Sequence, residues 1–151
     1  GRTKSGGAGA PRRLLRLSDG FDQQREEWEP VFAGAGRTLV ASVDESLSVT
    51  ASPGSLSQVI ATLLENSLAH GDGVTTLRGR EVQGGVAVEV ADEGQGVSEE
   101  LAPKIFEREF STGGSTGLGL AVARDLTAAD GGRLELSQRR PPVFTVFLPT
   151  R

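Results

Sequence analysis

Apolar residues between positions 53 and 70 recur every three or four positions, the spacing of one face of an α-helix. They are Leu56, Val59, Ile60, Leu63, Leu64 and Leu68. Ser52 and Pro53 suit a helix start, because serine caps free N–H groups and proline fits the first turn. Gly71 and Gly73 end the pattern. This segment is the clearest predicted helix of the chain.

Alternation of side-chain type predicts a strand at 86–91, where valines at 86, 88 and 90 alternate with alanine or glutamate. One face of that strand is therefore expected to be buried. Further expected strands are 37–43, 47–51, 74–82, 133–138 and 143–148. Residues 44–46 are expected to form the turn between the first two of these, and Pro141-Pro142 the turn of a closing hairpin.

Three more helices are expected. The first covers 20–35 and carries Phe21, Trp28 and Phe32 on one side. Pro30 is a residue that breaks or kinks a helix. A short helix is expected at 98–107, and a longer one opens from the glycine-rich stretch 113–119 and runs to about Ala129.

The N-terminal segment 1–17 is expected to be a flexible basic tail or linker, with Leu14, Leu15 and Leu17 as the stub of an upstream helix. Residues 18–151 then form one domain. Because its helices and strands each have one apolar face, the predicted fold class is α/β: a two-layer α/β sandwich with a mixed, mostly antiparallel sheet covered by helices on one face.

Composition narrows the function classes. The chain of 151 residues is 36% hydrophobic and 24% charged, which favours a soluble globular domain. It has no cysteine and one histidine, which excludes thiol catalysis and multi-histidine or cysteine-ligated metal sites. The net charge is −4, and an acidic body argues against nucleic-acid binding. No apolar run reaches the ~18 residues of a membrane helix, and no secretory signal is visible.

Two glycine-rich loops are candidates for holding phosphate, one at 92–96 after a strand and one at 113–119 before a helix. Neither is a Walker loop or a dinucleotide-binding fingerprint. The order of features is more informative than either loop. A polar helix end with Glu65, Asn66 and His70 comes first. The loop at 92–96, a phenylalanine-rich segment and the second loop follow in that order.

This ordered set resembles the ATP-binding catalytic domain of bacterial sensor histidine kinases, in the GHKL ATPase superfamily. LSQVIATLLENSLAHG is similar to the N box, VADEGQGV to the first glycine box, IFEREFST to the F box and STGLGLAVARDLTAADGG to the second glycine box. FTVFLP is similar to the closing strand. The resemblance runs from about Trp28 to Pro149 and implies the GHKL form of the two-layer sandwich.

The resemblance assigns the base of ATP to the first glycine box. A carboxylate at Asp92 can accept a hydrogen bond from the exocyclic amine of adenine, which guanine does not offer there. Gly94 and Gly96 would allow close approach of the backbone and a positive φ. The structural alternative is that Asp92 merely begins a turn before glycine.

The N box supplies the polar residues of the helix. Asn66 is implied as a nucleotide and Mg²⁺ ligand through its amide oxygen, since Mg²⁺ prefers oxygen and retains water. Glu65 is the candidate catalytic residue, polarising the attacking imidazole or a metal-bound water; the alternative is a solvated helix glutamate. His70 either contacts nucleotide phosphate or ends the helix near backbone carbonyls. It lies inside the N box, so it is not expected to be the phosphoacceptor.

The second glycine box implies a polyphosphate site. Thr116, Gly117, Leu118 and Gly119 are the expected contacts, because free N–H groups at a helix start bind anions. The hydroxyl of Ser115 would be a further donor.

Residues 107–116 would form a lid over the nucleotide. Phe106 and Phe110 are either lid anchors or core residues.

Two departures from the family pattern affect the phosphates and the lid. Many members have a lysine where this chain has Ala69, so charge neutralisation would come from Mg²⁺ and from Arg108 or Arg124. In the F box, Glu109 holds the place of the second phenylalanine and Phe110 follows.

The resemblance therefore implies a Mg·ATP-binding catalytic domain that delivers the γ-phosphate to a histidine on a dimerisation domain outside this chain. A response regulator would be an indirect partner. The fragment is expected to be monomeric and cytoplasmic, and the parent a homodimer anchored in the cell membrane. Two alternatives stay open: a stand-alone serine kinase of the anti-sigma-factor type, and a non-catalytic nucleotide-binding interaction domain.

Overall fold

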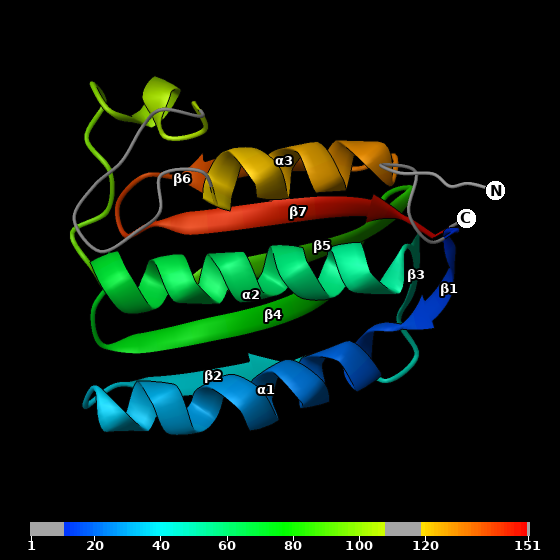
Figure 1. Ribbon diagram of the computed structural model, residues 1–151, viewed down its shortest axis with the longest axis horizontal. Helices are drawn as coiled ribbons and strands as arrows, with labels where there is room; N and C mark the ends of the chain where they lie inside the picture. Colours follow the sequence, from blue (N-terminus) through cyan, green and yellow to red (C-terminus); the bar gives the residue numbers. More distant parts are fainter. Residues whose placement is uncertain (1–10, 108–118, 151) are drawn as a thin grey trace, which may run out of the picture.

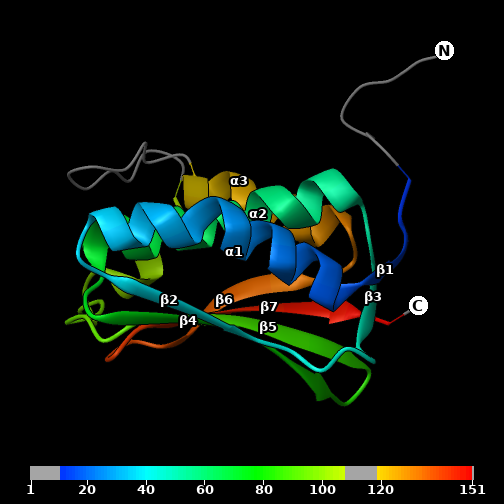
Figure 2. The same cartoon turned by 90° about the horizontal axis from the view of Figure 1, so that it is seen from below.

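A computed structural model describes residues 11–107 and 119–150. Its main layer is a five-stranded sheet, and helices α1, α2 and α3 lie on one face of that sheet (Figures 1 and 2). The strands are β2 (Thr38–Ser42), β4 (Val74–Val82), β5 (Gly85–Ala91), β6 (Arg133–Gln138) and β7 (Val143–Pro149). The predicted two-layer α/β sandwich is confirmed.

The sheet has the strand order β2-β4-β5-β7-β6. The pair β2–β4 is parallel and the other three pairs are antiparallel, so the sheet is mixed and mostly antiparallel as predicted. The predicted closing hairpin is β6 and β7. Valines at 86, 88 and 90 of β5 are buried, which confirms the buried face expected there. Ala87 on the other face is buried as well, so only Glu89 and Ala91 show the expected alternation.

The helices are α1 (Leu17–Gly34), α2 (Pro53–His70) and α3 (Gly119–Ala129). The central one, α2, buries its apolar stripe against the sheet, with Leu63 and Leu64 fully inaccessible to solvent. Pro30 was expected to break or kink α1, but the helix continues to Gly34. Its proline is exposed, while Phe21 and Phe32 anchor the two halves of the helix in the core.

Ser52 occupies the N-cap of α2, but its hydroxyl does not cap the helix. It donates instead to Asp130 at 2.9 Å, and the Ser52 N–H donates to the other oxygen of the same carboxylate at 3.0 Å. Asp130 follows α3 and is buried. A buried carboxylate therefore ties the start of α2 to the end of α3.

The N-terminal region differs from expectation. Residues Arg13–Arg16 form strand β1, which pairs antiparallel with β3 (Ser48–Ala51) in a separate two-stranded sheet. The prediction of a helix stub at Leu14 and Leu15 is therefore wrong, because the backbone there is extended and continues directly into α1. Leu14 is 66% exposed and Leu15 is half-buried, as expected for alternate sides of a strand. The tail residues 1–10 lie outside the described residues.

Strands β2 and β3 follow one another but do not form the expected hairpin, since they belong to different sheets. The turn at 44–46 is present. The Ser46 N–H donates to the Asp44 carboxylate at 2.8 Å, and this hydrogen bond lowers the pKa of Asp44. Because β2 pairs in parallel with β4, its partner comes from beyond α2 in the sequence.

The short helix expected at 98–107 is reduced to a 3-10 turn at Ala102–Lys104. Pro103 lies inside that turn, lacks an N–H donor and disfavours helical geometry at the residue before it. The Ser98 hydroxyl accepts from the Leu101 N–H at 3.2 Å, which begins the turn.

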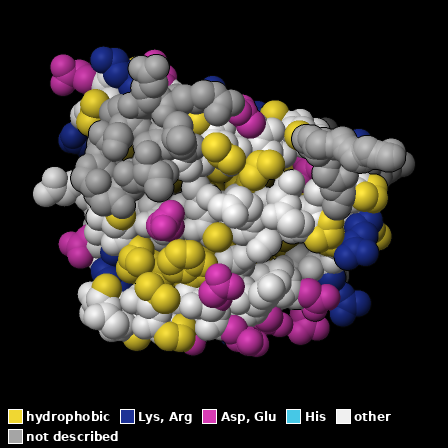
Figure 3. Space-filling model, viewed as in Figure 1, with side chains coloured by type: hydrophobic (Ala, Val, Ile, Leu, Met, Phe, Trp, Pro, Cys, Tyr) yellow, Lys and Arg dark blue, Asp and Glu magenta, His cyan; other side chains and the backbone are white. Residues whose placement is uncertain are grey.

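Charge is distributed unevenly over the surface. In the view of Figure 3, acidic side chains gather over α1 and basic ones lie near β1. Within residues 11–107 and 119–150, none of the helices combines the length and the apolar character that a membrane span requires.

Candidate functional site

A pocket lies where α2 and β5 end and β7 begins, and the loop after β5 completes its lining. These ends of α2, β5 and β7 lie at the left of Figure 1. The space inside the pocket is about 360 Å³ when the part open to solvent is included. The lining residues are Leu63, Asn66, Ser67, His70, Gly71, Val90, Asp92, Gly96, Val97, Pro142 and Phe144. Apolar walls with a few polar groups suit a flat, largely apolar ligand.

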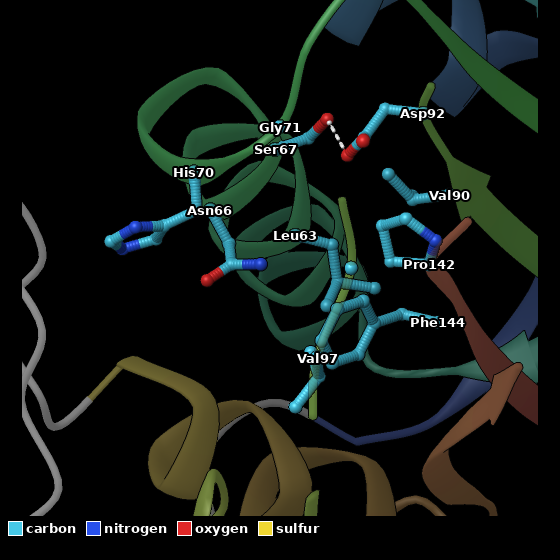
Figure 4. Close-up of a pocket in the computed structure, with 11 residues that line it drawn as sticks. Leu63, Asn66, Ser67, His70, Gly71, Val90, Asp92, Val97, Pro142 and Phe144 are labelled. Atoms are coloured by element: carbon cyan, nitrogen blue, oxygen red, sulfur yellow. Dashed lines mark hydrogen bonds between the residues drawn. The ribbon is translucent and has the colours of Figure 1, made fainter. Parts of the chain in front are cut away.

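Asp92 is the polar group at one wall of this pocket (Figure 4). It directly follows β5, where the sequence placed it. One carboxylate oxygen accepts from the Gly94 N–H at 2.7 Å, and the other accepts from the Ser67 hydroxyl at 2.7 Å. Both oxygens are therefore held by protein donors, and the orientation of the carboxylate is fixed.

Gly71 lies against that carboxylate. A Cβ atom built on Gly71 would collide with the Asp92 carboxylate and lie 2.7 Å from its Oδ1. On Gly94, a Cβ would lie 2.8 Å from the same oxygen and 3.0 Å from the Gly71 Cα. Sequence reasoning took Gly71 only as a helix stop, but its lack of a side chain makes room for Asp92.

The two glycines of the first box differ in backbone conformation. Gly96 has a φ of +80°, as expected, and its missing side chain leaves room for the carbonyl of Arg139. Gly94 is not among the glycines with positive φ, so that expectation is wrong for it. The close packing against Asp92, and not backbone conformation, requires glycine at position 94.

A hydrogen-bonded cluster behind Asp92 was missed by sequence reasoning. The Ser67 hydroxyl lies 2.8 Å from the Thr75 hydroxyl, which accepts from Arg37 at 2.9 Å. Ser67 is 3% exposed and Thr75 is 0% exposed. A signal was available for Ser67, which lies four positions after Leu63 and is a polar residue on the buried face of α2.

Asn66 and His70 lie one turn apart on α2 and line the same pocket, away from Asp92 (Figure 4). Asn66 is half-buried, and its amide has no hydrogen-bond partner within the described parts of the chain. Glu65, the candidate catalytic residue, is exposed and does not line the pocket. The structure thus brings Asn66, His70 and Asp92 together and leaves Glu65 outside the lining.

Several predicted residues lie outside the described residues. They are Thr116, Gly117 and Leu118 of the polyphosphate site, together with Arg108, Glu109, Phe110 and Ser115. Gly119 is the first residue of α3 and is half-buried.

Phe106 packs against the core. Its ring centroid lies 6.2 Å from that of Phe144, a pocket-lining residue, in an edge-to-face arrangement. The Arg124 guanidinium of α3 lies 5.4 Å above the Phe106 ring. Of the two alternatives for Phe106, the described contacts favour a core residue at the rim of the pocket.

The described residues contain no group of three or more histidine and carboxylate side chains able to hold a metal ion. The amide oxygen of Asn66 is the kind of donor that a hydrated Mg²⁺ accepts, because this ion takes few protein ligands when phosphate and water supply the others.

Comparison with known proteins identifies relatives of this chain. Sensor protein KdpD of Clostridium acetobutylicum is 36% identical over 107 residues, which cover 64% of this chain and 12% of that protein. Sensor histidine kinase component HK1 of Mycobacterium tuberculosis is 31% identical over 106 residues, covering 67% of this chain and 63% of that protein. This chain therefore corresponds to only part of these relatives.

Solved structures show the same fold. The catalytic domain of histidine kinase ThkA superposes with a TM-score of 0.83 at 24% identity, over 93% of this chain and 97% of that one. Full-length ShkA, solved in complex with AMPPNP, superposes with a TM-score of 0.80 at 26% identity, over 92% of this chain and 31% of that one.

The family model of histidine kinase-, DNA gyrase B- and HSP90-like ATPases matches residues 51–151, about two thirds of the chain. That stretch begins at the last residue of β3 and includes α2, the whole pocket lining and the closing hairpin. Together with the relatives and the fold, this match shows that the chain belongs to the histidine kinase-, DNA gyrase B- and HSP90-like ATPase family, as an ATPase catalytic domain of the histidine kinase type.

Proposed function

We propose that residues 18–151 bind Mg·ATP and deliver its γ-phosphate to a histidine on a dimerisation domain outside this chain. The observation that carries the proposal is the carboxylate of Asp92, fixed on both oxygens at the wall of an apolar pocket. A neighbouring fold, that of ShkA, was solved with an ATP analogue, which supports an adenine nucleotide as the ligand.

The base of ATP lies in this proposal between the apolar walls formed by Leu63, Val90 and Phe144. The amino group of adenine donates to Asp92, which has acceptor capacity left because each carboxylate oxygen has two lone pairs. Gly71 leaves room for the Asp92 carboxylate, and Gly96 leaves room for the carbonyl of Arg139.

The phosphates extend from the base toward Asn66 and His70, which line the same pocket on α2. Asn66 would hold Mg²⁺ through its amide oxygen, and the bound ion would neutralise phosphate charge during transfer. The second glycine box, from Thr116 to Gly119, would donate backbone N–H groups to the phosphates. Glu65 would polarise the attacking imidazole.

The phosphoacceptor histidine is proposed to come from another domain of the parent protein, because the one histidine of this chain is His70, inside the N box. The sensor kinases among the relatives support such a partner, and a response regulator as the next recipient. The parent would be a homodimer, and membrane anchoring of the parent is carried over from the resemblance alone.

Calorimetric titration with a non-hydrolysable ATP analogue, with and without Mg²⁺, tests the nucleotide proposal. We expect binding that Mg²⁺ strengthens. Absence of binding by the folded chain would contradict it.

Phosphotransfer is tested separately by adding the parent's dimerisation domain and radiolabelled ATP. Acid-labile label on that domain is expected, and none on this chain alone.

A further inference from the structure

Four side chains from different parts of the fold form a continuous row of hydrogen bonds ending at the pocket. Arg37 precedes β2, Thr75 lies on β4, Ser67 lies on α2 and Asp92 follows β5. The successive distances are 2.9, 2.8 and 2.7 Å. Figure 4 shows the last bond, with Ser67 and Asp92 pointing toward each other at the pocket wall.

The chemistry of the groups at the two ends fixes the direction of every bond. A guanidinium only donates, so Thr75 accepts from Arg37. A carboxylate only accepts, so Ser67 donates to Asp92. Because a hydroxyl has a single hydrogen, Ser67 has none left for Thr75 and must accept from it. Each hydroxyl hydrogen in the row therefore points toward Asp92.

The first member of the row is held rigidly. The Arg37 guanidinium donates to the carbonyls of Gly73 at 2.9 Å, Ser67 at 3.2 Å and Leu68 at 3.4 Å, and lies 5.4 Å above the ring of Phe32. These carbonyls lie at the end of α2 and just after it, and the Ser67 carbonyl also accepts from the Gly71 N–H at 2.8 Å. These contacts alone account for an arginine at position 37. They do not depend on the hydrogen bonds that lead from Thr75 through Ser67 to Asp92.

We propose that Arg37, Thr75 and Ser67 are positioning residues that hold Asp92 as the acceptor for the 6-amino group of a purine nucleotide. The inference rests on the proposed function and deepens it, because it assigns base selection to Ser67 at the pocket wall and to Arg37 and Thr75 behind it. With Ser67 on one carboxylate oxygen and the Gly94 N–H on the other, the carboxylate plane is fixed. An amino group on the ligand then meets lone pairs of Asp92 that already point toward it. A ligand without that amino group gains no affinity from their orientation.

The test compares ADP with purine riboside diphosphate, which lacks the 6-amino group, by calorimetric titration of the whole chain. Thr75→Val removes the hydroxyl but keeps the shape of the side chain. We expect ADP to bind about three- to tenfold more weakly, the cost of one hydrogen bond, and purine riboside diphosphate to bind within about twofold of wild type. Thr75→Ser restores the hydroxyl and should restore ADP binding.

Thr145→Val is the matched control. Thr145 is a buried threonine of β7 whose hydroxyl lies 2.6 Å from that of Ser137, and Ser137 also donates to the Val143 carbonyl. None of these three residues lines the pocket. This variant loses the same type of hydroxyl pair. It should be destabilised comparably in thermal unfolding, yet keep wild-type preference for ADP over purine riboside diphosphate.

Equal weakening of both nucleotides by Thr75→Val, or no rescue by Thr75→Ser, would overturn the proposal and leave the row a purely structural feature. Should Thr75→Val fail to fold, Ser67→Ala makes the same test from the neighbouring link and must narrow the ADP preference. If the wild-type chain binds neither nucleotide, the proposed function fails first and the positioning role fails with it. Binding without any preference for the amino group would overturn the positioning role alone.

Discussion

The two ends of the pocket differ in how firmly the protein holds them. At the end proposed to bind the base (the base end), Asp92 is fixed on both oxygens, and the hydroxyls behind it are almost completely buried. At the end proposed to bind the phosphates (the phosphate end), Asn66 is half-buried and His70 and Glu65 are exposed. The base end is thus organised without a ligand, whereas the phosphate end, in our proposal, would depend on the charges of the ligand and the metal. Substitutions at the two ends should therefore affect different parts of the nucleotide.

The largest effect is expected for Asp92→Asn. Three donors converge on the carboxylate in the proposed complex: the Ser67 hydroxyl, the Gly94 N–H and the adenine amine. An asparagine has one acceptor oxygen and adds a donor, so it cannot serve all three. We expect affinity for the ATP analogue to fall about ten- to a hundredfold in calorimetric titration, as for loss of a hydrogen bond to a charged group.

The same variant also tests whether Asp92 contacts only the base. Its loss should be equally large with ATP analogue, ADP and adenosine, because all three present the same base. A loss confined to the triphosphate would instead place Asp92 at the phosphate end and contradict the division of the pocket.

A smaller loss, about tenfold, is expected for Gly71→Ala. The added methyl group collides with the Asp92 carboxylate and displaces it from Ser67, at the cost of about one hydrogen bond to a charged group. Gly54→Ala is the matched control, since Gly54 lies at the start of the same helix with nothing within 4 Å of an added Cβ. That variant should bind as wild type does. Equal binding by the two variants would show that Asp92 tolerates displacement.

Sequence reasoning was most successful where one helix or strand decides the outcome by itself. The apolar stripe of α2 and the valine face of β5 each follow from local periodicity, and both are buried as expected. The pairing of β3 with β1 could not be predicted in this way, because it depends on a strand from a different part of the chain. The helix expected at 98–107 is reduced to a short turn, because Pro103 lacks the N–H donor that a residue in the interior of such a helix needs.

The same distinction applies to the site. Asp92 and Asn66 could be placed in the pocket from motifs, since each lies within a recognisable stretch of sequence. Arg37 and Thr75 could not, because no local pattern distinguishes them from other surface and strand residues. Their connection to Asp92 exists only once β2 and β4 pair in parallel and α2 packs across them. The positioning role proposed for Arg37 and Thr75 therefore depends on tertiary contacts that a local sequence pattern does not contain.

At the phosphate end, Asn66→Ala should reduce the gain in affinity that Mg²⁺ gives the ATP analogue by about fivefold, since one oxygen ligand is replaced by water. Adenosine binding should stay within about twofold of wild type, because the base lies at the other wall of the pocket. Titrations with and without Mg²⁺ measure both quantities. An equal loss for adenosine would mean that Asn66 supports the base as well.

The smallest effect on binding is expected for Glu65→Gln. Its carboxylate is exposed and lies outside the pocket lining, so solvent screens its field at the phosphates, and affinity for the ATP analogue should change by less than about twofold. Phosphotransfer to an added dimerisation domain should nevertheless slow, if this carboxylate polarises the attacking imidazole as proposed. A variant normal in both assays would assign Glu65 to the solvated face of α2. A variant impaired in transfer alone would show that the loosely held end of the pocket carries the chemistry and the rigid end selects the substrate.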